Sequence, residues 1–136
     1  MTKLAMPKID RKLVSKKVEI VANLKKIVKA ENVLDHEDQI RPFETDALSA
    51  YKQKPLLVVF PENTEEVSKI LAYCNQEKIK VIPRGAGTGL SGGALPLADG
   101  LLLCLTKFNK IINIDYKNRC VVAQPGVTNL SITQAV

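Results

Sequence analysis

The chain has 136 residues, of which 46% are hydrophobic and 25% are charged, and its net charge at pH 7 is +6. This length and composition are typical of one globular domain that can bury a core. No apolar run is long enough to span a bilayer, and lysines interrupt the N-terminal region where a secretory signal would be apolar. A cytoplasmic location is therefore expected.

The positive charge is concentrated at the N-terminus. Residues 1–30 hold nine lysines or arginines against two carboxylates, a net +7, so the rest of the chain carries −1. Apolar residues recur there at helical spacing and predict one helical face: Val14, Val18, Val21, Leu24 and Val28. Such a basic amphipathic helix over residues 11–30 suits the anionic inner face of a membrane, docking against a partner, or packing on its own domain with the lysines in water. Packing on its own domain is favoured, and none of these interpretations requires nucleic acid.

The next part of the chain changes from irregular to strongly apolar. Residues 31–51 lack clear periodicity and are expected to be irregular, with a short helix near residues 46–51. Residues 56–60 then form a continuous apolar run between Pro55 and Pro61. This pattern predicts a short strand that is buried on both faces.

A capped helix and a second strand follow. Asn63 is an N-cap residue type with a carboxylate, Glu66, three positions later. The apolar residues of the helix share one face: Val67, Ile70, Leu71 and Cys74. Residues 80–83 form the second strand. The three elements make a βαβ unit, whose right-handed crossover makes the two strands parallel.

The last third predicts more strands. Residues 101–105 form a further buried strand, and residues 111–115 with 119–124 predict a hairpin that turns at residues 117–118. Residues 128–136 open with capping residue types and predict the start of a helix. No C-terminal cap or helix breaker follows within the sequence. The chain is therefore expected to be the N-terminal piece of a longer protein or a truncated gene product. The predicted fold class is α+β with an α/β-like parallel unit.

The most informative segment is a glycine-rich loop at residues 84–93, Arg-Gly-Ala-Gly-Thr-Gly-Leu-Ser-Gly-Gly, which holds five of the seven glycines. Such a stretch lets the backbone adopt positive φ and aims successive N–H groups at an anion, typically a phosphate or pyrophosphate. The loop leaves the carboxyl end of the second βαβ strand, where ligands of open α/β sheets gather.

Two familiar phosphate loops fit this segment poorly. Residues 87–92 match G-x-G-x-x-G, but Pro96 stands where a Rossmann helix would gather its first turns. No Lys-Ser or Lys-Thr pair closes the glycines, as a loop for nucleoside triphosphates requires. What is left is a coil that binds a diphosphate through backbone N–H groups, with the hydroxyls of Thr88 and Ser91 as further donors.

Other properties of the loop are less specific. Arg84 is assigned a phosphate or structural contact in preference to a substrate contact. The alternative to a binding loop is a mobile surface loop, which glycines also produce. The apolar Leu90 and Leu95 argue against it, as does the buried strand before the loop.

The cysteines and the single histidine offer no metal site. Cys74, Cys104 and Cys120 are odd in number, lack C-x-x-C spacing and sit in apolar patterns, so they are expected to be buried reduced thiols. His36 lies in a polar acidic stretch without a histidine partner, and no metal site is expected.

Residues 83–96 resemble the pyrophosphate loop of FAD-linked oxidases of the vanillyl-alcohol oxidase and p-cresol methylhydroxylase type. Within that superfamily the chain most resembles the D-subunit family of bacterial glycolate oxidases. The likeness includes residues 41–51, 55–61 and 124–130, and it covers nearly all of residues 40–136.

This resemblance implies an incomplete FAD-binding domain of the p-cresol methylhydroxylase type at residues 41–136, preceded by a basic helix and linker at residues 1–40. It also implies a set of FAD-binding residues: Arg84, Gly85, Ala86, Gly87, Thr88, Gly89, Leu90, Ser91, Gly92 and Gly93 in the loop, with Pro125, Gly126 and Val127 in a second segment beside the cofactor. By sequence alone, an ordinary turn accounts for the second segment equally well. No histidine for covalent flavin attachment lies near the loop, so non-covalent FAD is expected.

The resemblance further implies a function. Full-length proteins of this type oxidise a 2-hydroxy acid such as glycolate or D-lactate by hydride transfer to flavin. Their substrate-binding residues lie in a later domain, so no catalytic residue is assigned here and the chain is expected to be inactive alone. The expected partners are FAD and the missing C-terminal part or other oxidase subunits. Two alternatives stay open: a non-catalytic remnant that acts as an interaction subunit, and a pyrophosphate-binding domain for another nucleotide.

Overall fold

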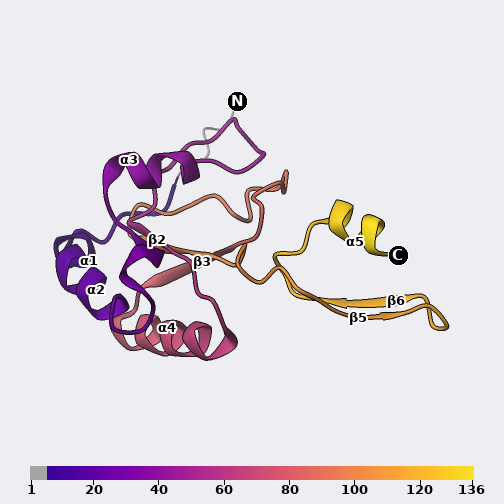
Figure 1. Cartoon of the computed structure of the whole chain (residues 1–136). Helices are drawn as coiled ribbons and strands as arrows, with labels where there is room; N and C mark the ends of the chain where they lie inside the picture. The colour runs from indigo at the N-terminus through magenta and orange to yellow at the C-terminus, as the bar shows by residue number, and fades with distance from the viewer. Residues whose placement is uncertain (1–5) are drawn as a thin grey trace.

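A computed structural model describes residues 6–136 and divides them into a body (residues 6–108) and a protruding arm (residues 109–136), as Figure 1 shows. The helices of the body are α1 (Arg11–Ser15), α2 (Lys17–Leu24), α3 (Glu37–Ile40) and α4 (Thr64–Glu77), with 3-10 turns η1 (Ala30–Asn32) and η2 (Arg41–Phe43). Its strands are β1 (Val33–Leu34), β2 (Leu57–Val59), β3 (Lys80–Arg84) and β4 (Gly100–Cys104). The arm consists of β5 (Ile111–Asp115), β6 (Cys120–Ala123) and α5 (Asn129–Ala135).

The predicted α+β fold with a parallel unit is confirmed. The sheet of the body has the order β1-β2-β4-β3, in which β2 and β3 both pair with β4 in parallel and β1 is an antiparallel edge. Strands β2 and β3 are therefore parallel, as the βαβ pattern predicted, but they are not neighbours. Strand β4 lies between them because it is buried at every position and so takes the central place in the sheet.

The N-terminal segment packs on the body, as favoured above, but with a different face from the one predicted. The helix is interrupted at Lys16, and the buried residues are Leu13, Ile20, Val21, Leu24 and Val28. Val14 is 36% exposed and Val18 is 83% exposed, so the prediction that they belong to the core is wrong. Leucine and isoleucine bury more apolar area than valine, which favours the observed face. Lys3 of the basic segment lies outside the described residues.

The predicted cap of α4 is confirmed. The Asn63 side chain accepts a hydrogen bond from the Glu66 N–H (2.9 Å), and the Glu66 carboxylate accepts one from the Glu62 N–H (2.7 Å). Ile70 and Cys74 are buried on the sheet, whereas Leu71 is 45% exposed, so its assignment to the core face is wrong. The helix contacts the sheet along a narrow stripe that does not reach Leu71.

The segment before β2 is less irregular than predicted. Residues 31–51 contain β1, α3 and two 3-10 turns, and no helix forms at residues 46–51. The Asp46 carboxylate instead accepts a hydrogen bond from the Leu48 N–H (2.9 Å). Such side-chain turns compete with helix formation, which explains the difference.

The arm matches its predicted elements. Strands β5 and β6 pair antiparallel, and Asp115 accepts hydrogen bonds from the Asn118 backbone and side chain at the turn. The Thr128 hydroxyl caps α5 by accepting from the Ser131 N–H (3.1 Å). No helix within residues 6–136 is long and apolar enough to cross a bilayer.

Two of the three thiols are buried as predicted. Burial raises the pKa of Cys74 and of Cys104 to about 11, and at Cys104 the positive charge of Arg84 opposes that effect. Cys120 is exposed on the hairpin, so its predicted burial is wrong. The apolar residues beside it in the sequence belong to a strand that the body does not cover.

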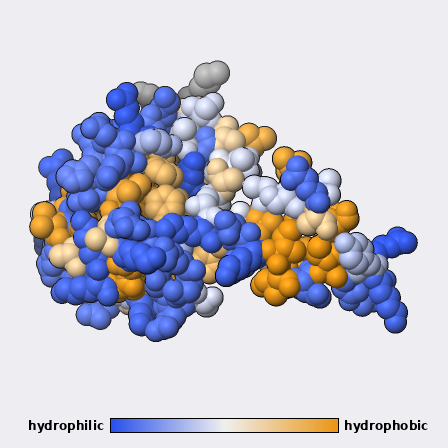
Figure 2. Space-filling model, in the orientation of Figure 1, coloured by the Kyte–Doolittle hydropathy of each residue, from blue (hydrophilic) through white to orange (hydrophobic). Residues whose placement is uncertain are grey.

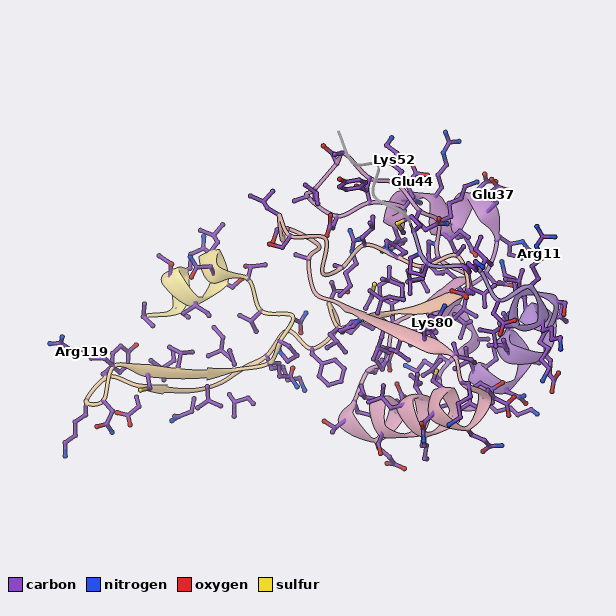
Figure 3. All side chains as sticks on the ribbon, turned by 180° about the vertical axis from the view of Figure 1, so that it is seen from behind. Arg11, Glu37, Glu44, Lys52, Lys80 and Arg119 are labelled. Carbon is purple, nitrogen blue, oxygen red and sulfur yellow. The ribbon has the colours of Figure 1, made fainter. Side chains whose placement is uncertain are left out.

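Two polar junctions tie the N-terminal segment to the sheet. The buried Asp99 carboxylate accepts hydrogen bonds from the Lys80 ammonium and the Asp10 N–H, both at 2.8 Å. Burial acts to raise the pKa of Asp99, but these donors together hold it below its ordinary value. Figure 3 shows Lys80 on the sheet, among the side chains of the body.

The second junction lies where β2 ends. Glu62 pairs with Lys29 (2.8 Å) and Lys107 (2.9 Å), and it also accepts a hydrogen bond from Asn32 (3.1 Å). The donors Lys107, Lys29 and Asn32 lower the pKa of the Glu62 carboxyl to about 2. The negative charge of Glu62 therefore joins three segments that are distant in the sequence.

The burial of the N-terminal segment predicts different costs for two valines of α2. We expect Val21→Ala, at a side chain that is 6% exposed, to lower the free energy of unfolding by about 1.5 to 3 kcal/mol. Val18→Ala, at a side chain that is 83% exposed, is expected to be neutral or slightly stabilising, because alanine is the better helix former. Urea denaturation of both variants measures the difference. Equal losses of stability in the two variants would contradict the burial of Val21 and the exposure of Val18.

The Glu62 junction predicts a pH-dependent stability. Glu62→Gln is expected to be less stable than the wild type at pH 7, because the amide loses both ion pairs. The advantage of the wild type is fully present above the ordinary glutamate pKa of 4.5 and is lost as the pH falls through about 2, where the folded protein protonates Glu62. Denaturation of both proteins between pH 7 and pH 2 tests this. A difference in the free energy of unfolding between the two proteins that stayed constant down to pH 2 would contradict this prediction.

Candidate functional site

The glycine-rich loop begins where β3 ends, at Arg84. Because β2, β3 and β4 are parallel, their carboxyl ends lie at the same edge of the sheet, and the loop emerges at that edge (Figure 1). Leu90 is 73% exposed. The use of its apolar side chain as evidence against a surface loop was therefore wrong. Leu95 is half-buried. The position of the loop agrees with the edge at which open α/β sheets bind ligands.

The backbone N–H groups of the loop have no hydrogen-bond acceptor among the described residues. None of the nine N–H groups from Gly85 to Gly93 donates a hydrogen bond to an acceptor within residues 6–136. Two of its carbonyls face the protein instead: Gly87 accepts from the Ala47 N–H (2.9 Å) and Gly92 from the Leu95 N–H (3.2 Å). Thr88 and Ser91 are exposed and add hydroxyl donors. This donor set suits an anion with several oxygens.

The glycines of the loop serve two purposes. Gly87 and Gly92 both have a φ of 74°, in the left-handed region that favours glycine, so they shape the turns. Gly89 and Gly93 have no other atom within 4 Å of the position that a Cβ would occupy. A ligand can therefore approach the backbone at these two positions.

The Arg84 side chain makes a structural contact. Its guanidinium donates a hydrogen bond to the Thr45 carbonyl (2.7 Å) and lies 5.7 Å from the centre of the Phe43 ring. It also occupies the space that a Cβ on Gly87 would need. Through these contacts, Arg84 anchors the start of the loop to residues 43–48.

Residues 43–48 were not predicted to belong to the site, and Asp46 is their most unusual member. Its side chain is 5% exposed, and Oδ2 is buried without a hydrogen-bond partner among the described residues. A buried carboxylate oxygen without a donor is rare in native proteins and is costly. The family resemblance of residues 41–51 includes this segment but gave it no role, because that role depends on contacts with Arg84 and Gly87 that only the fold creates.

The second predicted segment lies beside the first. A Cβ on Gly85 would be 3.8 Å from the Pro125 carbonyl oxygen, so the structure brings the two segments together. The Gly126 N–H donates to the Phe108 carbonyl (2.7 Å), and a Cβ on Gly126 would collide with the backbone of Leu105. Val127 closes a turn by donating to Gln124 (3.1 Å). The close approach at Gly126 is therefore to the protein's own backbone.

Among residues 6–136, no three or more His, Cys, Asp or Glu side chains are grouped in a way that could hold a metal ion. His36 precedes α3 and makes no side-chain cap.

Comparison with known proteins assigns the chain to a family. A family model described as an FAD binding domain matches residues 55–136. The chain belongs to this family of FAD-binding domains. It is 45% identical over 132 residues to the glycolate oxidase subunit GlcD of Escherichia coli K12, which covers 97% of this chain and 25% of that relative. It is 38% identical over 110 residues to the D-lactate dehydrogenase of Anaerostipes hadrus, which covers 80% of this chain and 23% of that relative.

The fold agrees with this assignment. The crystal structure of p-cresol methylhydroxylase with bound substrate superposes with a TM-score of 0.76 at 26% identity, covering 97% of this chain and 26% of that one. The sequence-based resemblance to this superfamily is thereby confirmed. The chain spans about a quarter of the length of the relatives it matches.

The residues present fit the FAD that the family implies. Its pyrophosphate is an anion with several oxygens, and the loop offers consecutive N–H donors that have no acceptor among the described residues. The open space at Gly89 and Gly93 lets a phosphate reach those donors. The Arg84 guanidinium already has a backbone acceptor in Thr45, so the fit rests on the backbone.

The two kinds of glycine predict opposite effects on stability. We expect Gly87→Ala to cost at least about 1 to 2 kcal/mol, because alanine is strained at positive φ and its Cβ displaces Arg84. Gly89→Ala is expected to be neutral or slightly stabilising, since its Cβ meets no other atom. Denaturation of the protein without ligand measures both. A cost at Gly89 equal to that at Gly87 would be inconsistent with this geometry.

Proposed function

We propose that the glycine-rich loop holds the pyrophosphate of FAD, and that the chain is the N-terminal FAD-binding portion of a flavin-dependent 2-hydroxy-acid oxidoreductase. The observation that carries the proposal is the run of nine N–H groups from Gly85 to Gly93 without an acceptor among the described residues. Backbone donors of this kind bind phosphate without a charged side chain. Family membership supports the choice of FAD over other dinucleotides.

Each part of the loop has a role in this binding. The N–H groups donate to the phosphate oxygens, and the hydroxyls of Thr88 and Ser91 add further donors. Gly89 and Gly93 keep the approach open, while Gly87 and Gly92 set the turns that aim the donors outward. Arg84 positions the loop through Thr45.

The second segment completes the proposed contact. The Pro125 carbonyl oxygen lies next to Gly85, 3.8 Å from the position of a Cβ there. We assign FAD contacts to Pro125, Gly126 and Val127 on this basis. The only histidine is His36, which is outside both segments, so we propose that FAD is bound without a covalent link.

The proposed reaction requires residues beyond this chain. When bound, FAD supplies the acceptor for the hydride of the substrate. The relatives include a glycolate oxidase subunit and a D-lactate dehydrogenase, which supports a 2-hydroxy acid as the substrate. This chain spans about a quarter of those proteins, and we assign it no catalytic residue.

We propose that the FAD-binding domain begins near residue 41 and that residues 1–40 are the basic helical segment and a linker, whose β1 adds an edge strand to the sheet of that domain. The family match starts at residue 55. Residues 43–48 nevertheless hold the loop, through the Ala47 N–H and the Thr45 carbonyl. A domain without them would lose the support of its binding loop.

Titration of FAD with the purified chain tests the proposal. We expect saturable quenching of flavin fluorescence and a rise in melting temperature. Gly89→Val is expected to weaken binding at least tenfold, because its side chain fills the open approach without meeting other protein atoms.

Ala22→Val is the matched control, since it also places a valine side chain at an exposed position, here on α2. It is expected to bind FAD like the wild type. A folded wild-type chain that did not bind FAD, or equal affinity in Gly89→Val, would overturn the proposal.

A further inference from the structure

The arm exposes apolar side chains that folded proteins normally cover. Exposed fractions are 65% for Ile112, 70% for Tyr116, 51% for Val122, 65% for Leu130 and 62% for Val136. Figure 2 shows a hydrophobic patch over the arm, beside a body whose surface is mostly hydrophilic. No residue of α5 is buried. A two-stranded hairpin of this kind is marginally stable unless another element packs on it.

The exposed residues divide unequally between the two faces of the hairpin. Ile114 pairs with Val121, and alternate residues of a strand point to the same face. Ile111 pairs with Ala123, and the register shifts at Ile112, which lines a cavity together with Ala123. Tyr116 follows the strand and lines a cavity together with Ile114 and Val121. These residues are called here the apolar face: Ile111, Ile112, Ile114, Tyr116, Val121 and Ala123. The opposite face carries Asn113, Asp115, Cys120 and Val122. One side of the hairpin is therefore built for contact with apolar groups.

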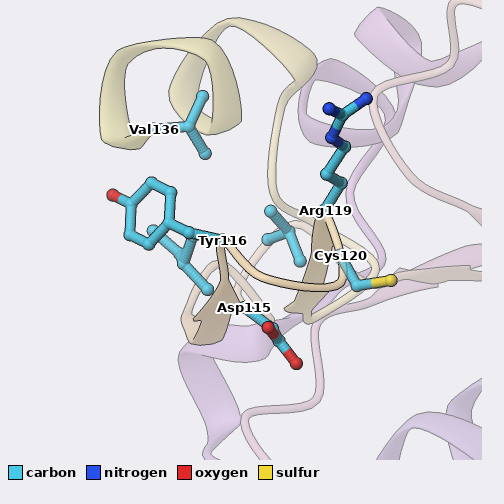
Figure 4. Close-up of a pocket in the computed structure, with 7 residues that line it drawn as sticks. Asp115, Tyr116, Arg119, Cys120 and Val136 are labelled. Atoms are coloured by element: carbon cyan, nitrogen blue, oxygen red, sulfur yellow. The ribbon is translucent and has the colours of Figure 1, made fainter.

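Two cavities open along the apolar face. The first, of about 390 Å³, lies at the base of the arm between Val67 of α4 and Ile112. The second, of about 270 Å³, lies near the tip. It is lined by Ile114, Tyr116, Val121 and Val136, together with Asp115, Arg119 and Cys120. Figure 4 shows Tyr116 and Val136 on either side of this second cavity. Residues of the apolar face therefore border both cavities.

The edges of the hairpin are also free. Within the described residues, β5 and β6 form a sheet of their own, so each has one edge without a strand partner. Exposed edges next to an apolar face are where further β-structure adds in protein assembly. The curated relatives contain about four times the length of this chain, so the domain family has polypeptide to supply such a cover.

We propose that the apolar face of the hairpin is the docking surface for the polypeptide that completes the FAD-binding domain in the longer relatives. That polypeptide packs apolar side chains against the residues of this face that border the two cavities. The interaction involves no cofactor, so it stands apart from the proposed binding of FAD.

Co-purification tests the proposal. The probe is the part of Escherichia coli GlcD that follows its 132-residue match, co-expressed with the affinity-tagged full chain. We expect the probe to be retained by the wild type. Ile112→Lys is expected to reduce retention at least tenfold, because it buries an ammonium group against the apolar face. Val122→Lys places the same group on the opposite face of the same hairpin and is expected to retain the probe.

The outcomes separate the possible occupants. Loss of the probe from the wild type, or equal retention by Ile112→Lys, would overturn the proposal. A dimer of the chain alone, seen by light scattering and dissociated by Ile112→Lys, would make a second copy the occupant and would also overturn it. Circular dichroism checks that each variant is folded, and Tyr116→Lys repeats the test at a second position of the apolar face.

Discussion

The insertion of β4 between β2 and β3 is the constraint on which the rest of the structure depends. All five residues of β4 are buried, so the strand is covered on both faces and paired at both edges. This arrangement makes three parallel strands end together and brings the glycine-rich loop, Glu62 and Lys107 to one side of the body. It also fixes the backbone of residues 105–108, against which Gly126 packs. The site therefore depends on a core strand that no ligand touches.

The loop shows how glycine and a fixed anchor act together. Glycine permits an open backbone, but by itself it would leave the donors without a defined direction. Arg84 and residues 43–48 supply that direction by binding one end of the loop and one of its carbonyls. The same segment contains the buried Asp46 carboxylate, with one oxygen unpaired among the described residues. Such groups are rare in native proteins, and strained groups cluster at functional sites.

Local signals in the sequence predicted most of the fold. The apolar run before Pro61, the Asn63 cap and the hairpin all depend on neighbouring residues, and all three are confirmed. Errors arose where two faces of one helix were both apolar, as at Val18 and Leu71, because only packing decides between them. The order of the strands and the anchoring of the loop by residues 43–48 depend on contacts between distant segments. No periodicity encodes such contacts.

The distribution of the thiols has a practical consequence. Burial raises the pKa of Cys74 and Cys104 to about 11, so at neutral pH only about one in ten thousand of these groups is a reactive thiolate. Cys120 is exposed on the arm, on the face that carries Asn113 and Asp115. A maleimide dye would therefore label the native protein selectively at Cys120. That label would report on the surroundings of the arm without touching the core or the glycine-rich loop.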